Sequence, residues 1–184
     1  AILELDPESG EIVWEWHIWD HLIQDFNPDL PGYGVISEHP ELMDINCGTV
    51  GNDTGGPQGA NGDWMHINAV NYNPELDQIV ISSRGQDEIF ILDHSTTLDE
   101  AAGHVGGNSG KGGDFLYRWG NPANYGRGDE SDKILNDQHS INWIPPGYPG
   151  EGNLILFNNF HEDSQSAVLE LSAPLEDGNY ILDG

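Results

Sequence analysis

The chain has 184 residues, enough for one ordinary domain, and its 24 glycines and 11 prolines favour turns over helices. Its 32 Asp and Glu residues against five Lys and Arg residues give a net charge of −27, which argues against nucleic acid or an anionic membrane as a partner. No apolar run approaches the roughly 20 residues that span a bilayer, and no signal peptide is visible. The single cysteine, Cys47, excludes an internal disulfide and is expected to be a packed thiol.

The first residues already have a strand pattern. Residues 2–6 (ILELD) and 12–16 (IVWEW) are predicted to form two short strands, the second of them aromatic. Because this pattern begins directly after Ala1, we expect the chain to be part of a longer protein. Residues 23–62 fit no repeat and are interpreted as a long insertion, with a short helix expected near residues 21–26.

Residues 63–122 contain a pattern of four strands. One begins at His66, and the others are expected at residues 78–83, 89–93 and 115–119. Four antiparallel strands that recur in a fixed order are typical of a propeller blade. These residues are therefore predicted to form one full blade.

The same order of strands returns in residues 123–184, where one strand begins at His139 and the next is expected at residues 153–158. The sequence therefore predicts an all-β fold, a β-propeller of which this chain covers roughly two and a half blades. Residues 1–22 would end one blade, residues 63–122 would form a full blade, and residues 123–184 would form most of the next.

His66, Arg84 and His139 form the leading candidate site. The two histidines stand at the same point of neighbouring blades, and Arg84 ends the strand that follows His66. A neutral imidazole can act as a nucleophile or a general base, and a guanidinium presents a planar fork of donors to oxyanions. The set predicts transfer of an anionic group such as sulfate or phosphate. Metal binding is the second choice, because no motif of paired histidines is present, and no metal site is predicted.

Other polar and aromatic residues receive simpler interpretations. Residues 106–113 (GGNSGKGG) look like a phosphate-binding loop but lack its Lys-Ser/Thr ending, so a plain loop is predicted. An aryl ligand would need aromatic walls, for which Trp64 and Tyr125 are the candidates. Three histidines in turns or loops are interpreted as surface residues: His94, His104 and His161.

Seven short motifs stand in a distinctive order along the chain. They are residues 63–70 (DWMHINAV), 81–86 (ISSRGQ), 91–93 (ILD), 117–122 (YRWGNP), 125–128 (YGRG), 138–139 (QH) and 143–145 (WIP). In this combination they resemble the bacterial arylsulfate sulfotransferase (arylsulfotransferase, ASST) family. The resemblance covers roughly residues 60–184, with a weaker match in residues 1–22.

The resemblance implies a six-bladed propeller that moves a sulfuryl group from an aryl sulfate to a phenolic acceptor, without PAPS or any other cofactor. By motif, His139 would be the nucleophile that carries the group as a sulfohistidine. His66 and Arg84 would bind the sulfuryl oxygens, and Asn68 would orient His66. Ser140 follows His139 where the family pattern leads us to expect an aspartate.

The family also uses a histidine upstream of the His66 motif, and no earlier histidine of this chain stands in a matching motif. Activity is therefore expected of the longer protein rather than of this chain alone. The implied partners are a small aryl sulfate donor and a phenolic acceptor, with a homo-oligomer left open, and the implied location is periplasmic or extracellular.

The alternative function is a non-catalytic propeller that binds anionic ligands or partner proteins, and a third reading is a hydrolase with water as acceptor. Because a chain with a net charge of −27 repels sulfate esters in general, either kind of site must be a local positive spot.

Overall fold

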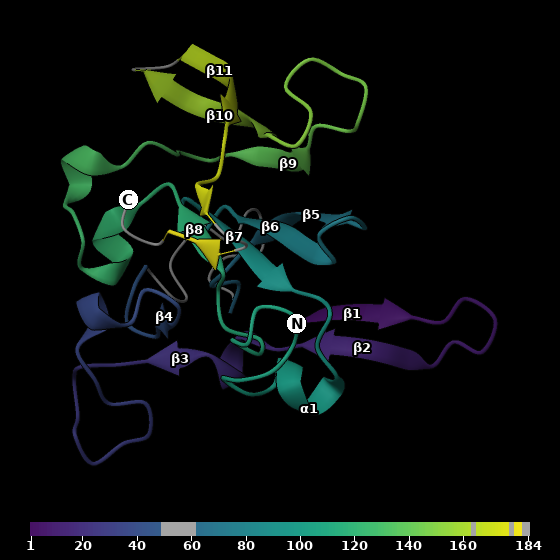
Figure 1. Cartoon of the computed structure of the whole chain (residues 1–184). Coiled ribbons are helices and arrows are strands. Elements are labelled where there is room, and N and C mark those ends of the chain that lie inside the picture. Colours follow the sequence, from purple (N-terminus) through teal and green to yellow (C-terminus); the bar gives the residue numbers. More distant parts are fainter. Residues whose placement is uncertain (49–61, 163–164, 177–178, 182–184) are drawn as a thin grey trace.

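A computed structural model describes residues 1–48, 62–162, 165–176 and 179–181 of the chain (Figure 1). In this part, strands dominate and the α-helical content is one short helix, α1 (Leu98–Ala101). The all-β prediction is therefore confirmed. The end of the expected insertion, residues 49–61, lies outside the described residues, as do residues 182–184.

The central element is a four-stranded antiparallel sheet in the order β5-β6-β7-β8. Its strands are β5 (Ile67–Asn73), β6 (Gln78–Ser83), β7 (Glu88–Asp93) and β8 (Tyr117–Trp119). Apart from half-buried Gln78, every residue of β6 and β7 is buried, since neighbouring sheets cover both faces. This explains why residues 79–81 and 89–92 are unbroken apolar runs rather than alternating with polar residues.

One face of the central sheet packs on the N-terminal hairpin, which consists of β1 (Ile2–Leu5) and β2 (Ile12–Trp16). Trp14 and Trp16 of β2 form one hydrophobic cluster with Ile81 and Phe90 of the sheet. Trp14 also donates a hydrogen bond from Nε1 to Thr96 Oγ1 at 3.0 Å. The tryptophans of the hairpin are therefore packing residues between two sheets.

The opposite face packs on a three-stranded sheet in the order β11-β10-β9. Its strands are β9 (His139–Trp143), β10 (Leu154–Glu162) and β11 (Gln165–Leu171). Val80 and Ile91 from the central sheet cluster with Ile141 and Leu156 from β9 and β10. Figure 1 shows the result as a stack, with β9–β11 at the top, β5–β8 in the middle and β1–β2 below.

A short hairpin ends the described chain, formed by β12 (Leu175–Glu176) and β13 (Asn179–Tyr180). Tyr180 Oη donates to Gln78 Oε1 at 2.7 Å, so this hairpin returns to the central sheet. The described strands form separate small sheets and show no closed ring. The propeller therefore stays a prediction, whereas face-to-face packing of consecutive sheets is observed.

The helix expected near residues 21–26 is wrong. A 3-10 turn, η1 (Ile18–Asp20), leads into β3 (Leu22–Ile23), which pairs in parallel with β4 (Met43–Asp44). Gln24 then folds back, and its Oε1 accepts hydrogen bonds from the backbone N–H groups of residues 26 and 27. The pairing of β3 with β4 and the hydrogen bonds to the Gln24 side chain satisfy backbone groups that would otherwise bond within a helix.

The remaining helical turns lie in connections: η2 (Ile36–Glu38), η4 (Pro122–Tyr125) and η5 (Glu130–Asp132). The helix α1 begins with a capping box, in which Thr97 and Glu100 bond each other's backbone N–H groups. Among the described residues, no helix has both the length and the apolar character that a membrane crossing requires.

A sealed ion pair joins β7 to β8. Arg118 Nε and Nη2 donate to the Glu88 carboxylate at 2.9 and 2.6 Å, and Nη1 donates to the carbonyl of Leu42 at 3.0 Å. The ring of Tyr125 lies 4.2 Å from the guanidinium carbon. Burial raises the pKa of Glu88, and the charge of Arg118 opposes that change.

Cys47 is a packed thiol, as expected. Its Sγ lies 3.2 Å from Gln86 Oε1 and 3.5 Å from Met43 Sδ. Burial raises the pKa of Cys47 to about 12, so the reactive thiolate is suppressed.

Candidate functional site

His66 and Arg84 lie side by side at one end of the central sheet. His66 directly precedes β5 and Arg84 directly follows β6, and antiparallel pairing brings these two points together. The Arg84 N–H donates to the His66 carbonyl at 3.1 Å. His66 has a φ of 45°, and the register of β5 shifts between Ile67 and Ala69. Left-handed backbone and a bulge at a strand end are features that often accompany functional sites.

The imidazole of His66 is held by a carboxylate. Its Nδ1 lies 2.5 Å from Asp63 Oδ2, and Asp63 Oδ1 accepts the His66 backbone N–H at 3.1 Å. The carboxylate is an acceptor only, so Nδ1 carries the proton in this contact. Nε2 has no hydrogen-bond partner within the described parts of the chain, and the side chain is half-exposed. A carboxylate in this position orients the ring and can stabilise positive charge that develops on it.

Arg84 forms an ion pair through one of its guanidinium nitrogens. Its Nη2 lies 2.8 Å from Asp137 Oδ1 and 2.9 Å from Asp137 Oδ2, with the two side chains 31% and 28% exposed. A guanidinium has five N–H donors. Those on Nε and Nη1 have no partner among residues 1–48, 62–162, 165–176 and 179–181, so three donors can still bind an incoming oxyanion.

Asp137 connects this arginine to a second basic residue. It has a φ of 53°, and its backbone N–H donates to Asp87 Oδ1 at 3.0 Å. Asp87 Oδ2 in turn lies 3.4 Å from Lys133 Nζ, and burial raises the pKa of Asp87. Two of the five basic side chains of the chain therefore lie at this spot, and both are paired with carboxylates, since Lys133 Nζ also lies 2.7 Å from Glu130 Oε1.

The ring of His139 is also oriented by Asp137, but through the backbone. His139 Nδ1 lies 3.0 Å from the Asp137 carbonyl oxygen and 3.0 Å from Asn159 Nδ2. Asn159 Nδ2 donates to the same carbonyl at 2.6 Å. When Nδ1 donates its proton to this carbonyl, the neutral ring keeps a lone pair on Nε2. Nε2 of His139 has no partner in the described part of the molecule.

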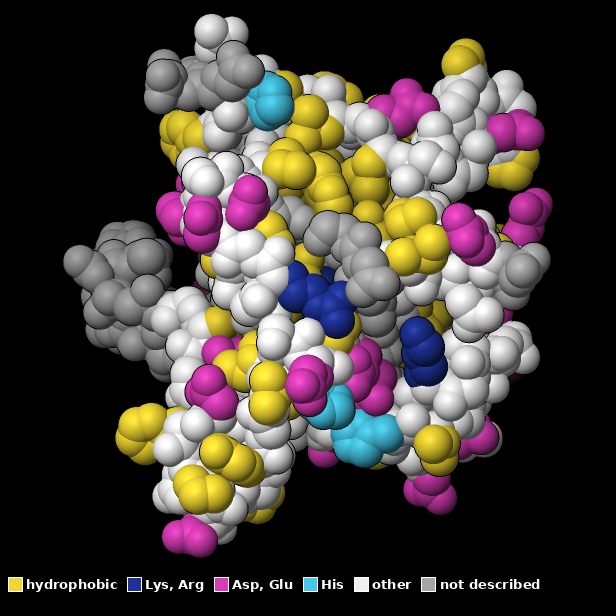
Figure 2. Space-filling view, turned by 60° about the vertical axis from the view of Figure 1, so that its left-hand side comes forward, with side chains coloured by type: hydrophobic (Ala, Val, Ile, Leu, Met, Phe, Trp, Pro, Cys, Tyr) yellow, Lys and Arg dark blue, Asp and Glu magenta, His cyan; other side chains and the backbone are white. Residues whose placement is uncertain are grey.

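Arg84 and His139 thus converge on one residue. The carboxylate of Asp137 holds the guanidinium, and its carbonyl holds the imidazole. His66 joins the set through its backbone bond to Arg84. The three residues predicted from the sequence therefore share one end of two neighbouring sheets. Figure 2 shows that basic side chains on the displayed face form small spots among scattered acidic ones.

Asn68 contacts the strand of His139 rather than the ring of His66. Its Nδ2 donates to the Gln138 carbonyl at 2.7 Å, across the boundary between the two sheets. Gln138 Nε2 reaches back to the carbonyls of Ser83 at 2.9 Å and Glu88 at 3.0 Å. The observed contacts of Asn68 therefore position β9 against β5, and not His66 as the motif implied.

The two aromatic candidates are engaged in packing. Trp64 is buried, donates from Nε1 to the Cys47 carbonyl at 2.8 Å and stacks on Trp19 at 6.1 Å between ring centroids. Tyr125 is buried beneath Arg118, as described above. Neither ring forms an exposed wall beside His139, so their role in binding an aryl group stays a prediction.

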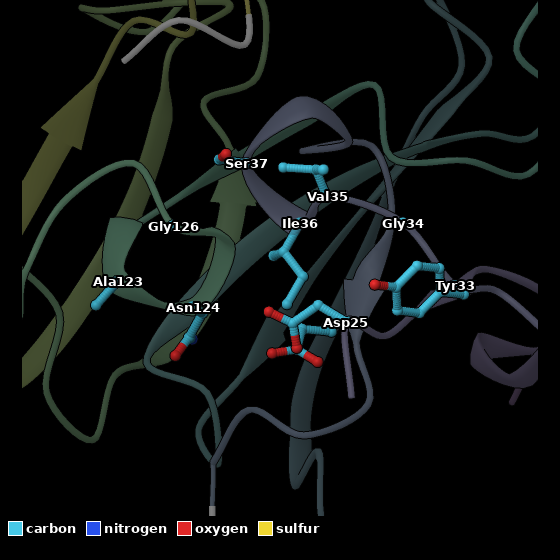
Figure 3. Close-up of a pocket in the computed structure, with 10 residues that line it drawn as sticks. Asp25, Tyr33, Gly34, Val35, Ile36, Ser37, Ala123, Asn124 and Gly126 are labelled. Carbon is cyan, nitrogen blue, oxygen red and sulfur yellow. The ribbon is translucent and has the colours of Figure 1, made fainter. Parts of the chain in front are cut away.

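A cavity of 390 Å³ lies elsewhere, between residues 25–44 and η4. Figure 3 shows Asp25, Tyr33 and Ile36 among the residues that line it. Asp44 also lines it, and burial together with the charge of Asp25 raises the pKa of Asp44. This cavity has two carboxylates, and no Lys, Arg or His is among the described residues that line it, so it offers a sulfate ester less than the histidine cluster does.

The structure places three further residues in the cluster that the sequence did not predict: Asp63, Asp137 and Asn159. The two aspartates had a visible signal, because each stands shortly before one of the histidines in the repeated motif. Asn159 had none, since its contact depends on how the end of β10 passes β9, where the register of the pair shifts.

A family model described as arylsulfotransferase (ASST) matches residues 1–174, which is nearly the whole chain. Comparison with curated proteins and with solved structures gives no match.

Proposed function

The chain belongs to the arylsulfotransferase family, and from this premise we propose that it supplies the sulfuryl-transfer site of an arylsulfate sulfotransferase. Membership indicates a sulfotransferase at the level of the family. The finer proposal is that an aryl sulfate donates its sulfuryl group to His139, which passes it to a phenolic acceptor. The observation that carries it is the convergence of Arg84 and His139 on Asp137.

In the first step, Nε2 of His139 attacks the sulfur of the aryl sulfate. The new N–S bond forms as the bond between sulfur and the aryl oxygen breaks, and the aryl oxide leaves with the bonding electrons. This role needs the tautomer in which Nδ1 donates to the Asp137 carbonyl and Nε2 keeps its lone pair. The 3.0 Å contact of Nδ1 with that carbonyl supports this tautomer, in which Asn159 Nδ2 donates to the same carbonyl and not to Nδ1.

The negative charge of the sulfuryl oxygens needs donors that are already in place. The three remaining N–H groups of Arg84 meet this need, and a fork of donors suits an oxyanion better than a point charge. In its imidazolium form, the ring of His66 would donate from Nδ1 to the Asp63 carboxylate and from Nε2 to a sulfuryl oxygen. Donors arranged before the reaction stabilise a transition state more than water does.

In the second step, the oxygen of a phenol attacks the sulfur of the sulfohistidine and loses its proton to solvent. The N–S bond breaks, and its electrons return to Nε2 of His139. No cofactor takes part in either step. The stacked sheets support a propeller with the site at one end of the strands, and we extend the proposal to a periplasmic or extracellular enzyme.

Steady-state turnover tests this function. The full-length protein is incubated with 4-nitrophenyl sulfate, with and without phenol, and nitrophenol release is followed by absorbance. We expect release that depends on phenol, and parallel lines in double-reciprocal plots against the two substrates, because the sulfuryl group waits on the enzyme.

Release that is equally fast without phenol would favour the hydrolase, in which water is the acceptor. Saturable binding of the ester without any release would favour the non-catalytic anion-binding module. The matched control is His161→Ala, which removes an exposed histidine of β10 outside the cluster and should leave turnover unchanged.

A further inference from the structure

Two histidines and an aspartate meet on the other side of the central sheet, beside the N-terminal hairpin. His21 Nδ1 and His104 Nδ1 lie 2.7 and 2.8 Å from the same atom, Asp114 Oδ1. The three ligand atoms all lie within 4.8 Å of one another. From this geometry we propose that His21, His104 and Asp114 bind one divalent transition-metal ion of the Zn²⁺ type. The proposal is independent of the sulfuryl-transfer function.

The surroundings of His21 call for a cation. Its side chain is fully buried, and its Nε2 lies 2.9 Å from the Ala101 carbonyl oxygen. A carbonyl only accepts, so Nε2 must carry a proton. In a neutral ring Nδ1 would then present a lone pair to the carboxylate oxygen at 2.7 Å, which is repulsive. Something positive has to lie between Nδ1 and Asp114, either a second proton or a metal ion.

A metal ion fits the hydrogen bonds that are present. Histidines that bind metals typically donate their second N–H to a carbonyl or a carboxylate, which orients the ring. The Ala101 carbonyl already does this for His21. Trp16 adds rigidity, because its ring stacks on His21 at 5.6 Å with an angle of 4° between the planes.

The chain approaches this cluster in a way that leaves no room for another side chain. A Cβ on Gly113 would lie 2.6 Å from His21 Nε2 and 2.1 Å from the Ala101 carbonyl. The Gly113 N–H donates to the Gly103 carbonyl at 3.0 Å, which closes the glycine-rich loop and brings its flanking residues His104 and Asp114 together. The glycine-rich loop thus has a structural role, which is to hold His104 and Asp114 close together, rather than a phosphate-binding role.

The exposure of His104 and the carboxylate of Asp114 also favour the binding of a cation. The His104 side chain is 59% exposed while that of Asp114 is 8% exposed, so one ligand can swing outward and admit the ion. Asp114 Oδ2 has no partner in the described part of the chain and can serve as a further ligand. With bonds of about 2.0–2.2 Å, two ligand atoms of a tetrahedral site lie roughly 3.3 Å apart, so each histidine nitrogen would move about half an ångström away from Asp114 Oδ1 to admit the ion.

The donor set decides the class of metal. Two imidazoles and one carboxylate are ligands for zinc and related first-row ions, whereas calcium and magnesium prefer sites made of oxygen alone. The three ligands come from residues 21, 104 and 114, so a bound ion would tie the segment after β2 to the loop before β8. His104, interpreted from the sequence as a plain surface residue, becomes a ligand in this proposal.

Calorimetry with Zn²⁺ tests the site. The metal-free full-length protein is titrated with zinc chloride at physiological salt and excess calcium chloride, which occupies exposed carboxylates. We expect one tight site per chain. His104→Ala should weaken it by at least the roughly 10–100-fold that loss of even an outer-shell partner costs. The matched control is His39→Ala, since His39 is similarly exposed and also bonds one carboxylate oxygen at 2.8 Å.

Two further measurements keep the test independent of folding defects. Co²⁺ should produce the visible absorption bands of a nitrogen–oxygen site in the wild type and in His39→Ala, but not in His104→Ala. Zn²⁺ should raise the Tm of the first two proteins and not of the third, as binding to the folded state requires. Absence of saturable Zn²⁺ binding in the wild type, or equal binding in His104→Ala, would overturn the proposal.

Discussion

The central sheet and its neighbour contain two arginine–carboxylate pairs that differ in how far they are open to solvent. Arg118 and Glu88 are both 0% exposed, and every nitrogen of that guanidinium donates to a carboxylate or a carbonyl. Arg84 and Asp137 are about one-third exposed, and only one guanidinium nitrogen of Arg84 has a partner in the described part of the chain. The same pair of chemical groups therefore serves structure where it is sealed and can serve a ligand where it is open.

The neighbours reinforce this difference. Arg118 lies among the aromatic rings of Tyr125, Phe90 and Phe115, which leave no access. Beside Arg84 stand His66 and His139, each with one ring nitrogen that has no partner within the described residues. Enclosure, rather than the identity of the pair, separates a stabilising contact from a candidate site. Substitution of Arg118 should therefore mainly lower the free energy of unfolding, whereas substitutions at Arg84 and the histidines beside it should mainly lower kcat/KM.

The largest effect is expected at His139. Replacing it with alanine removes the proposed nucleophile, so kcat/KM for 4-nitrophenyl sulfate with phenol should fall by about 10³-fold or more. The Tm should stay near that of the wild type, because the ring is half-buried and its bonds lie at a strand end. If His139→Ala keeps most of the wild-type kcat/KM, the site beside Arg84 and Asp137 has no catalytic role.

The next largest effect is expected at the sealed pair, and it concerns stability. Arg118→Met leaves the Glu88 carboxylate buried without its partner, so the free energy of unfolding should fall by about 3–5 kcal/mol in urea denaturation. Arg84→Met should lower it by about 1 kcal/mol or less, because that pair is partly exposed. Equal losses in the two variants would remove the distinction between the pairs.

A smaller effect, again on activity, is expected at Arg84. Arg84→Ala should lower kcat/KM by about 10²–10³-fold, the range for loss of one transition-state donor. Arg84→Lys should recover only part of this, since an ammonium cannot offer the planar fork. The matched control is Arg127→Gln, an arginine whose Nε donates to the Ser37 carbonyl at 3.0 Å, away from the cluster. Full activity in Arg84→Lys would show that charge alone is required.

The smallest effect is expected for Asp137→Asn. The substitution keeps the carbonyl that His139 contacts, and asparagine tolerates the left-handed backbone at this position, where φ is 53°. Only the charged contact to Arg84 is weakened, so kcat/KM should fall by about tenfold, the lower end for a group that orients a site residue. A loss as large as that of His139→Ala would mean that the carboxylate itself takes part in the chemistry.

The sequence predicts the features that depend on local pattern, which are the strands and the residues at their ends. The apolar run at residues 79–81 is visible along the chain, and antiparallel pairing then puts Arg84 next to His66. The joining of Arg84 to His139 is not visible, because it runs through the carboxylate and the carbonyl of Asp137. Likewise, Tyr125 packs against the Arg118 guanidinium, and His21 meets Asp114 across 93 residues of sequence. Contacts between distant segments depend on packing, which no local pattern encodes.

The most direct test of the central claim is detection of the sulfuryl group on His139. The full-length protein is mixed with 4-nitrophenyl sulfate without acceptor, quenched under alkaline conditions, digested, and analysed by mass spectrometry. We expect the mass of one sulfuryl group on the peptide that contains His139, its loss after a chase with phenol, and its absence in His139→Ala. Nitrophenol release with an unmodified His139 peptide, or with the group on another residue, would contradict the account.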